Sequence, residues 1–247
     1  MKKIFLVAAI LFIFLGLNAQ SLKEANDLYK KGDFKKSAQI YESLVSQNFE
    51  SSSLYFNLGN SYYKMSKIAP AILNYERALL LNPTDRDIRY NLRMTRTLVK
   101  DKINEIPVFF LVRWKNSIVM YFNTDTWAIL SIILFVTFLI LMIFFLFSKS
   151  RRKKKIIFSL SGLLFLFVVF SNICASFQKD RLTEREYAIV FSPSVTLKGS
   201  PNDSGTELFL LHEGTKVKII ENLGDWTNVQ ISDGNEGWIH KNSIRQI

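Results

Sequence analysis

The sequence predicts a multidomain fold with three parts: an all-α helical-repeat domain, a two-helix transmembrane hairpin and a small all-β barrel. Three observations predict it. Positions within residues 20–104 recur with a period of 34, residues 127–147 and 156–176 carry no charge, and residues 177–247 contain five short segments typical of strands.

Each of the two uncharged runs is 21 residues long. A helix that rises about 1.5 Å per residue would then cross a hydrocarbon core about 30 Å thick. Lipid offers no partner to an unpaired backbone N–H or C=O, so both runs should be helical. The alternative is a buried helical hairpin in a soluble protein, which the absence of a polar stripe disfavours.

The loop between the two runs, residues 148–155, is almost purely basic because Lys149 is followed by the cluster from Arg151 to Lys155. The positive-inside rule places such a loop in the cytoplasm. Both outer ends of the hairpin, and the domains attached to them, should therefore lie on the opposite side of the membrane.

Residues 1–19 have the layout of a secretory signal peptide: Lys2 and Lys3 precede a short apolar stretch, and small residues follow it. We predict cleavage between Ala19 and Gln20. An uncleaved anchor is the alternative, and it would deliver residue 20 to the same side of the membrane.

The formal net charge of +11 does not indicate a nucleic-acid partner, because part of the excess lies in the leader and in the basic loop. No basic platform with interleaved aromatic residues is present. Cys174 is the only cysteine, so no intramolecular disulfide can form. His212 and His240 lack the spacing of a metal motif, and we expect neither a metal nor another cofactor.

The repeat period pairs Tyr29 with Tyr63 and Tyr41 with Tyr75. The second copy of the repeat has small residues where two helices would touch and aromatic residues around that contact. Its characteristic positions are Tyr55, Leu58, Gly59, Tyr62, Ala71, Tyr75, Ala78 and Pro83. This pattern resembles the tetratricopeptide repeat over residues 18–85. Residues 84–104 are predicted to add a capping helix with one arginine-rich face, which completes a domain of residues 20–104.

The resemblance implies a groove that binds protein segments and performs no chemistry of its own. The residues that map to this groove are Asn26, Tyr29, Lys30, Phe56, Asn57, Asn60, Tyr63, Lys64 and Tyr90. Members that clamp a C-terminal carboxylate have basic residues where this chain has Leu22, Asp87 and Asn91. We therefore expect an internal peptide or a protein surface as the ligand.

Residues 105–126 form an aromatic-rich stretch that is interrupted by Arg113 and Lys115 too early to span a bilayer. We predict an amphipathic segment at the membrane interface, with Trp114, Tyr121 and Trp127 at headgroup depth. The alternative is the final helix of the repeat domain.

Residues 177–247 are predicted to form the barrel. Strands are expected at 187–191, 195–197, 216–220, 226–231 and 236–239, separated by turn signals that include Asp233-Gly234. The phrases LHEGTKVKIIE and GDWTNVQISDGNEGWI resemble the bacterial SH3-like domain. Its candidate binding surface contains Trp226 and His240, and the alternative for Trp226 is a partly buried barrel residue. His240 and Ser243 stand where proline-binding relatives have proline and tyrosine, so proline-motif binding is not expected.

The order of parts, from signal through repeats and hairpin to SH3-like barrel, is similar to the BatE-type proteins of aerotolerance operons. This resemblance implies a multi-pass protein of the bacterial inner membrane with both terminal domains in the periplasm. It also implies a non-enzymatic scaffold that works with other Bat-type membrane proteins. A cell-wall sensor whose barrel binds peptidoglycan is the alternative. The sequence shows no nucleophile–base pair, phosphate-binding loop or metal cluster, so we do not expect an enzyme.

Overall fold

The computed structural model describes residues 20–103 and 106–247. It separates into two compact units. The first contains a helical repeat domain (residues 20–103) and a β domain (residues 185–247), and the second is Pro107–Glu184. The predicted signal peptide and its cleavage site at Ala19 lie outside the described residues, so that prediction stands untested.

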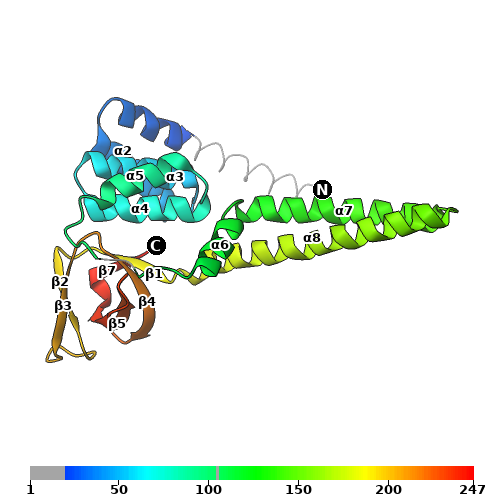
Figure 1. Ribbon diagram of the computed structural model, residues 1–247. Coiled ribbons are helices and arrows are strands. Elements are labelled where there is room, and N and C mark those ends of the chain that lie inside the picture. The colour runs from blue at the N-terminus through cyan, green and yellow to red at the C-terminus, as the bar shows by residue number, and fades with distance from the viewer. Residues whose placement is uncertain (1–19, 104–105) are drawn as a thin grey trace, which may run out of the picture. The chain divides into compact units, whose positions relative to one another are not determined.

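The repeat domain is a stack of antiparallel helices (Figure 1). A helix over residues 20–30 is followed by α2 (Phe34–Ser46), α3 (Ser52–Lys64), α4 (Ile68–Leu81) and α5 (Arg86–Arg96). The helix α4 starts one repeat period after α2, and α5 starts one repeat period after α3. The period seen in the sequence is therefore the period of the helices.

Local side chains fix where these helices begin. The Asp33 carboxylate accepts a hydrogen bond from the Lys36 N–H at 3.1 Å, and the Ser51 hydroxyl accepts one from the Leu54 N–H at 3.1 Å. Both are N-caps, which satisfy backbone donors that the first turn leaves unpaired. The starts of α2 and α3 are thus encoded one residue before each helix.

Gly59 allows α3 and α4 to approach closely. A Cβ atom at this position would lie 2.7 Å from the ring of Tyr75 and 3.3 Å from the carbonyl oxygen of Ala71. Such distances are too short for carbon atoms, so any side chain would push the helices apart. This confirms the steric role expected of Gly59, Ala71 and Tyr75 in the second repeat.

The capping helix is shorter than the expected span of 84–104. It ends at Arg96, and the following residues leave the helix. The reason is tertiary, because Asp101 there bonds to groups of the β domain more than a hundred residues later in the chain. Sequence periodicity carries no information about such distant partners.

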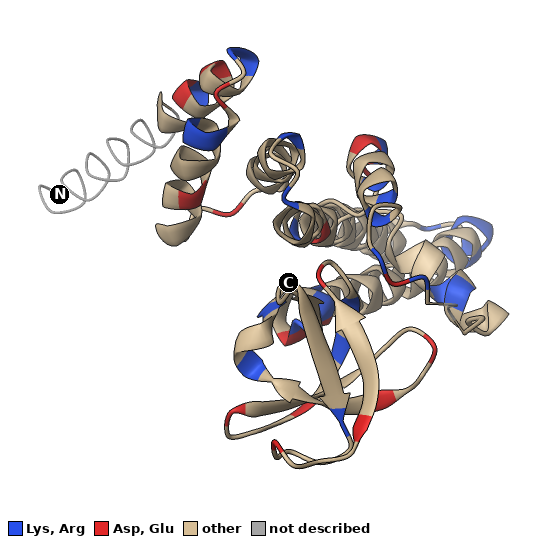
Figure 2. Ribbon diagram, turned by 90° about the vertical axis from the view of Figure 1, so that its left-hand side faces the viewer, with Lys and Arg blue, Asp and Glu red and all other residues tan. Residues whose placement is uncertain are grey.

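The β domain contains one antiparallel sheet with the strand order β3-β2-β6-β5-β4-β1-β7. The strands are β1 (Tyr187–Val190), β2 (Ser194–Lys198), β3 (Glu207–His212), β4 (Lys216–Leu223), β5 (Trp226–Gln230), β6 (Glu236–His240) and β7 (Ile244–Gln246). Acidic and basic residues are interspersed over this domain (Figure 2). All five expected strands are present, whereas β3 and β7 were missed.

The repeat domain and the β domain share a hydrophobic core. Ile189 of β1 and the C-terminal Ile247 belong to the same buried cluster as Ile72 and Tyr75 of α4. The contact is close at Gly214, where a Cβ atom would lie 2.9 Å from Cγ2 of Val99. Gly214 also has a φ of +86°, a conformation that glycine adopts without strain.

The second unit contains α6 (Phe110–Val119), α7 (Thr124–Phe147) and α8 (Arg151–Glu184). The helices α7 and α8 run side by side as an antiparallel pair (Figure 1), and both are long and apolar enough to cross a membrane. The second helix extends beyond the predicted span of 156–176 at both ends. It begins inside the basic cluster, and it continues through residues 177–184, most of which are polar.

Polar side chains connect α7 and α8 near one end of the pair. The Asn172 amide donates to the Ser131 hydroxyl at 2.6 Å, and the Ser171 hydroxyl donates to the carbonyl oxygen of Trp127 at 2.8 Å. Such bonds stabilise helix pairs in lipid by about 1 kcal/mol each. They fix the register of one helix against the other.

Candidate functional site

Asparagine side chains connect several of the residues that are predicted to line the groove. Oδ1 of Asn26 accepts two hydrogen bonds, one from the Tyr41 hydroxyl at 2.6 Å and one from the Asn57 amide at 3.1 Å. These contacts join the helix over residues 20–30 to α2 and α3. Two of the predicted groove residues, Asn26 and Asn57, are therefore in direct contact.

The same arrangement recurs one repeat later. Oδ1 of Asn60 accepts from the Tyr75 hydroxyl at 2.8 Å and from the Asn91 amide at 2.8 Å. Each member of this second set follows its counterpart in the first set by one repeat period. The asparagines of the two sets form a ladder across the helix over residues 20–30, α3 and α5, and the tyrosines join it from α2 and α4. In these bonds Asn26 and Asn60 act as acceptors through Oδ1, so the N–H groups of their Nδ2 atoms are not used in the ladder.

Aromatic side chains surround this ladder. The ring of Tyr29 lies 5.2 Å from that of Phe34, and the ring of Phe56 lies 5.9 Å from that of Tyr75. Burial raises the pKa of Tyr75, and the nearby Tyr29 hydroxyl raises it further. Tyr75 therefore stays neutral and remains a hydrogen-bond donor to Asn60.

The remaining predicted groove residues lie at the surface. Tyr63, Lys64 and Tyr90 are exposed, and the Lys30 ammonium is 3.8 Å from the Asp27 carboxylate on the same helix. Such a pair is only weakly stabilising in water. The lysines are therefore free to exchange this contact for one with a ligand.

One residue of α5, Tyr90, was assigned to the groove from the sequence. Asn91 was noted only as a departure from the carboxylate clamp, yet it completes the second set of the ladder. Met94 and Leu98 were missed. A signal was present in the sequence, because these three residues follow Asn57, Asn60 and Lys64 by one repeat period.

The β domain presents a second candidate surface. Trp226 of β5 and His240 of β6 are directly opposed across the sheet, and their ring centroids are 4.0 Å apart with an interplanar angle of 32°. Nε2 of His240 lies 3.2 Å from the Asp203 carboxylate. The two residues predicted for this surface are thus stacked on each other.

An open hollow of about 670 Å³ extends from His240 over the adjacent strands. It is lined by Ile219, Asn222, Asp225, Thr227, His240, Lys241, Asn242, Ile244, Arg245 and Gln246. Both signs of charge and several amides are present, so the hollow suits a polar ligand that carries both donors and acceptors.

Two families match parts of the chain. Residues 52–85 match the tetratricopeptide repeat, and residues 193–245 match the bacterial SH3 domain. Comparison with curated proteins finds no match. The tetratricopeptide match covers α3 and α4, and the SH3 match covers β2 to β6 together with most of β7. The chain thus combines a tetratricopeptide repeat region, two apolar helices and an SH3-like sheet.

Tetratricopeptide repeats and bacterial SH3 domains are interaction modules, which suit protein or peptidoglycan ligands. Among residues 20–103 and 106–247, no group of three or more His, Cys, Asp or Glu side chains is placed to hold a metal ion. The groove and the Trp226 surface therefore remain the candidate sites.

A buried ion cluster joins the two modules. Glu76 of α4 is paired with Lys216 of β4 at 2.8 Å and also with Arg96. Burial raises the pKa of Glu76, but the two cations outweigh it and hold that pKa below its usual value. The carboxylate is therefore charged at neutral pH, and its partners come from both domains.

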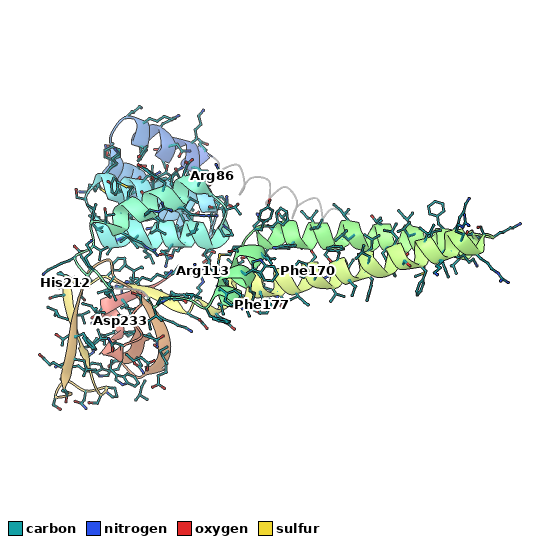
Figure 3. All side chains as sticks on the ribbon, viewed as in Figure 1. Arg86, Arg113, Phe170, Phe177, His212 and Asp233 are labelled. Carbon is teal, nitrogen blue, oxygen red and sulfur yellow. The ribbon has the colours of Figure 1, made fainter. Side chains whose placement is uncertain are left out.

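A second polar contact lies at the end of β3 (Figure 3). The Asp101 carboxylate accepts from the Thr215 hydroxyl at 2.6 Å and from the backbone N–H and ring Nδ1 of His212, both at 2.7 Å. Partial burial raises the pKa of Asp101, but these hydrogen bonds lower it below its usual value. His212 therefore acts in the joint between the domains.

Proposed function

We propose that the protein is a membrane-anchored scaffold that binds envelope proteins through its repeat domain and its SH3 domain. The single observation that carries the proposal is the shared core of the two domains, in which Ile189 and Ile247 pack with Ile72 and Tyr75. The groove and the Trp226 surface are thereby carried on one body. The proposal assigns no catalytic residue to either surface.

The proposed location is the bacterial inner membrane, with both domains in the periplasm. The turn between α7 and α8 is strongly basic from Lys149 to Lys155. A basic turn favours the cytoplasmic side, so both ends of the hairpin would face outward. The hairpin then acts as a two-helix anchor.

The proposal includes an interfacial position for α6. Its exposed residues include Phe110, Leu111 and Trp114, while Lys115 lies 4.9 Å from the ring of Phe177 on α8. Phe177 and Arg113 are labelled in Figure 3. Because the exposed apolar side chains continue the apolar surface of the hairpin, lipid is the expected neighbour.

The finer assignment is to a Bat-type envelope complex. It rests on the similarity in the order of signal, repeats, hairpin and SH3-like domain to BatE-type proteins. Other Bat-type membrane proteins are the partners that this similarity implies.

Site-specific photocrosslinking in intact cells tests the scaffold. A photoreactive amino acid at Tyr63, in the groove, should crosslink to a membrane or periplasmic protein. The same group at Gln39, which is exposed on α2, serves as the control. Equal crosslinking from both positions, or none from Tyr63, would contradict the proposal.

A cell-wall sensor is a second candidate, because the Trp226–His240 stack borders a hollow with amides and both signs of charge. Peptidoglycan carries amides, hydroxyls and both charges. The full chain in detergent should then sediment with purified sacculi, and Trp226→Ala should reduce the pelleted fraction. No pelleting of the unmodified chain would exclude this candidate.

A further inference from the structure

Helix α5 has a side that is neither packed into the core nor part of the arginine-rich face. Ile88, Leu92 and Thr95 are buried against the repeat domain. On another face, Tyr90, Met94 and Leu98 are 61%, 44% and 55% exposed. Their regular spacing, about one helical turn between neighbours, places them in one stripe along the helix and its last turn, and we call these three residues the apolar stripe.

The apolar stripe borders the asparagine ladder. Asn91, which adjoins Tyr90, donates to Asn60 at 2.8 Å. Tyr90, Met94 and Leu98 follow Phe56, Asn60 and Lys64 by one repeat period. The stripe therefore occupies on α5 positions equivalent to those on α3 that are predicted to line the groove, and it extends that predicted surface onto α5.

The charges around the groove are mostly positive. Lys30 and Lys64 are exposed and occupy equivalent positions of successive repeats, on two adjacent helices of the groove. Arg86 (labelled in Figure 3) and Arg93 are exposed on α5 beside the apolar stripe. Two opposing charges lie nearby: Asp27, which is 3.8 Å from Lys30, and Asp87, which is exposed in the first turn of α5.

We propose that the groove binds an extended, acidic protein segment that anchors a large apolar side chain on the stripe formed by Tyr90, Met94 and Leu98. This inference rests on the proposed scaffold function and specifies the partner. Adjacent packed helices are about 10 Å apart, and an extended chain advances about 3.3 Å per residue. Acidic residues about three positions apart would therefore reach Lys30 and Lys64.

The asparagine ladder favours a protein segment over a lipid surface. The Asn26 and Asn60 amides can donate to backbone carbonyl groups, and carbonyl groups recur regularly along an extended chain. Lipid tails would cover the apolar stripe but would leave these donors unpaired. A second copy of the chain is disfavoured by the lysines and arginines, which would repel an equally basic surface.

Fluorescent nonapeptides of defined design provide the probes. The first carries two acidic residues three apart and two large apolar residues, and the second replaces the acidic residues with serine. The third replaces the apolar residues with serine, and the fourth replaces the acidic residues with lysine. Binding to the full chain in lipid nanodiscs is measured by fluorescence anisotropy.

The first peptide should bind at least about tenfold more tightly than the other three, as expected for loss of one anchoring contact. The double variant Met94→Ser/Leu98→Ser should abolish the preference for apolar residues, whereas Leu223→Ser, at a residue 58% exposed on β4, should not. Lys30→Ser/Lys64→Ser should abolish the preference for acidic residues, whereas Lys35→Ser, on α2, should not.

The inference would be overturned if all four peptides bound equally or if none bound. It would also be overturned if Met94→Ser/Leu98→Ser and Leu223→Ser had equal effects. A concentration-dependent dimer that Met94→Ser/Leu98→Ser dissociates would also overturn it in favour of a second copy. If crosslinking from Tyr63 still captures a protein in any of these cases, the scaffold stands and only the partner chemistry is wrong. If Tyr63 captures none, the scaffold itself fails.

Discussion

The Lys216 ammonium lies 2.8 Å from the buried Glu76 carboxylate, although the two residues are 140 positions apart in the chain. Glu76 belongs to α4 and Lys216 to β4. A buried carboxylate is stable only when it is paired. The buried negative charge of Glu76 in the repeat domain is therefore stabilised in part by a cation from the β domain.

Replacement of Glu76 by glutamine should destabilise the joint by about 2 kcal/mol. Breaking a fully buried ion pair would cost more free energy of unfolding. Lys216 and Arg96 are partly exposed, so water can solvate their charges once the carboxylate is gone. Hydrogen exchange of α4 and β4 measures the effect as a loss of protection. Glu186→Gln is the control, since its pair with Lys218 is exposed on both sides; an equal loss there would contradict the assignment.

The joint should also weaken in acid. The pKa values of Glu76 and Asp101 lie below their ordinary values of 4.5 and 3.8. A carboxylate with a lowered pKa stabilises the fold above its ordinary pKa, and this contribution is lost as the pH falls through the lowered value. The melting temperature of the full chain should therefore fall as the pH drops below about 4.5. Glu76→Gln should show a smaller fall, and identical pH profiles would refute this explanation.

Gly59→Ala should separate α3 from α4 and cost about 1–3 kcal/mol, because the added methyl group would lie 2.7 Å from the Tyr75 ring. Thermal melting followed by circular dichroism measures the loss. Gly162→Ala is a helical control with no atom within 4 Å of the added Cβ, and little change is expected there. A Gly59 variant as stable as the unmodified chain would show that the ring moves aside freely.

Tryptophan fluorescence tests the position of α6. Trp114 is 66% exposed on the helix that is expected to contact lipid. Quenching by brominated lipids in reconstituted vesicles should decrease in Trp114→Phe, since one lipid-exposed fluorophore is removed. It should not decrease in Trp226→Phe, because Trp226 belongs to the β domain. Undiminished quenching in Trp114→Phe would place α6 away from the membrane.

Local patterns predicted much of the fold. Tyr41 and Tyr75 are one repeat period apart, so the period of the helices could be read directly from the sequence. The strand β3 was missed because its residues Leu208, Phe209 and Leu210 are all exposed and show no alternation between buried and exposed positions. β7 is only three residues long.

The joint between the domains could not be predicted. It depends on single residues such as Glu76, Asp101 and His212, whose partners are more than a hundred positions away. A charged residue in a helix pattern usually indicates solvent, so Glu76 gave no signal of burial. The groove remains a prediction, and the capping role assigned to α5 concealed the exposed apolar stripe on that helix.

Helix α5 starts one repeat period after α3, and this bears on how the repeat array could lengthen during evolution. This start makes α5 equivalent to the opening helix of a third repeat, while Ile189 and Ile247 of the β domain already pack with residues of α4, the closing helix of the preceding repeat. Tandem duplication, the ordinary route by which solenoids lengthen, is therefore obstructed at this end. Evolution of a longer groove would have to insert units upstream of α3.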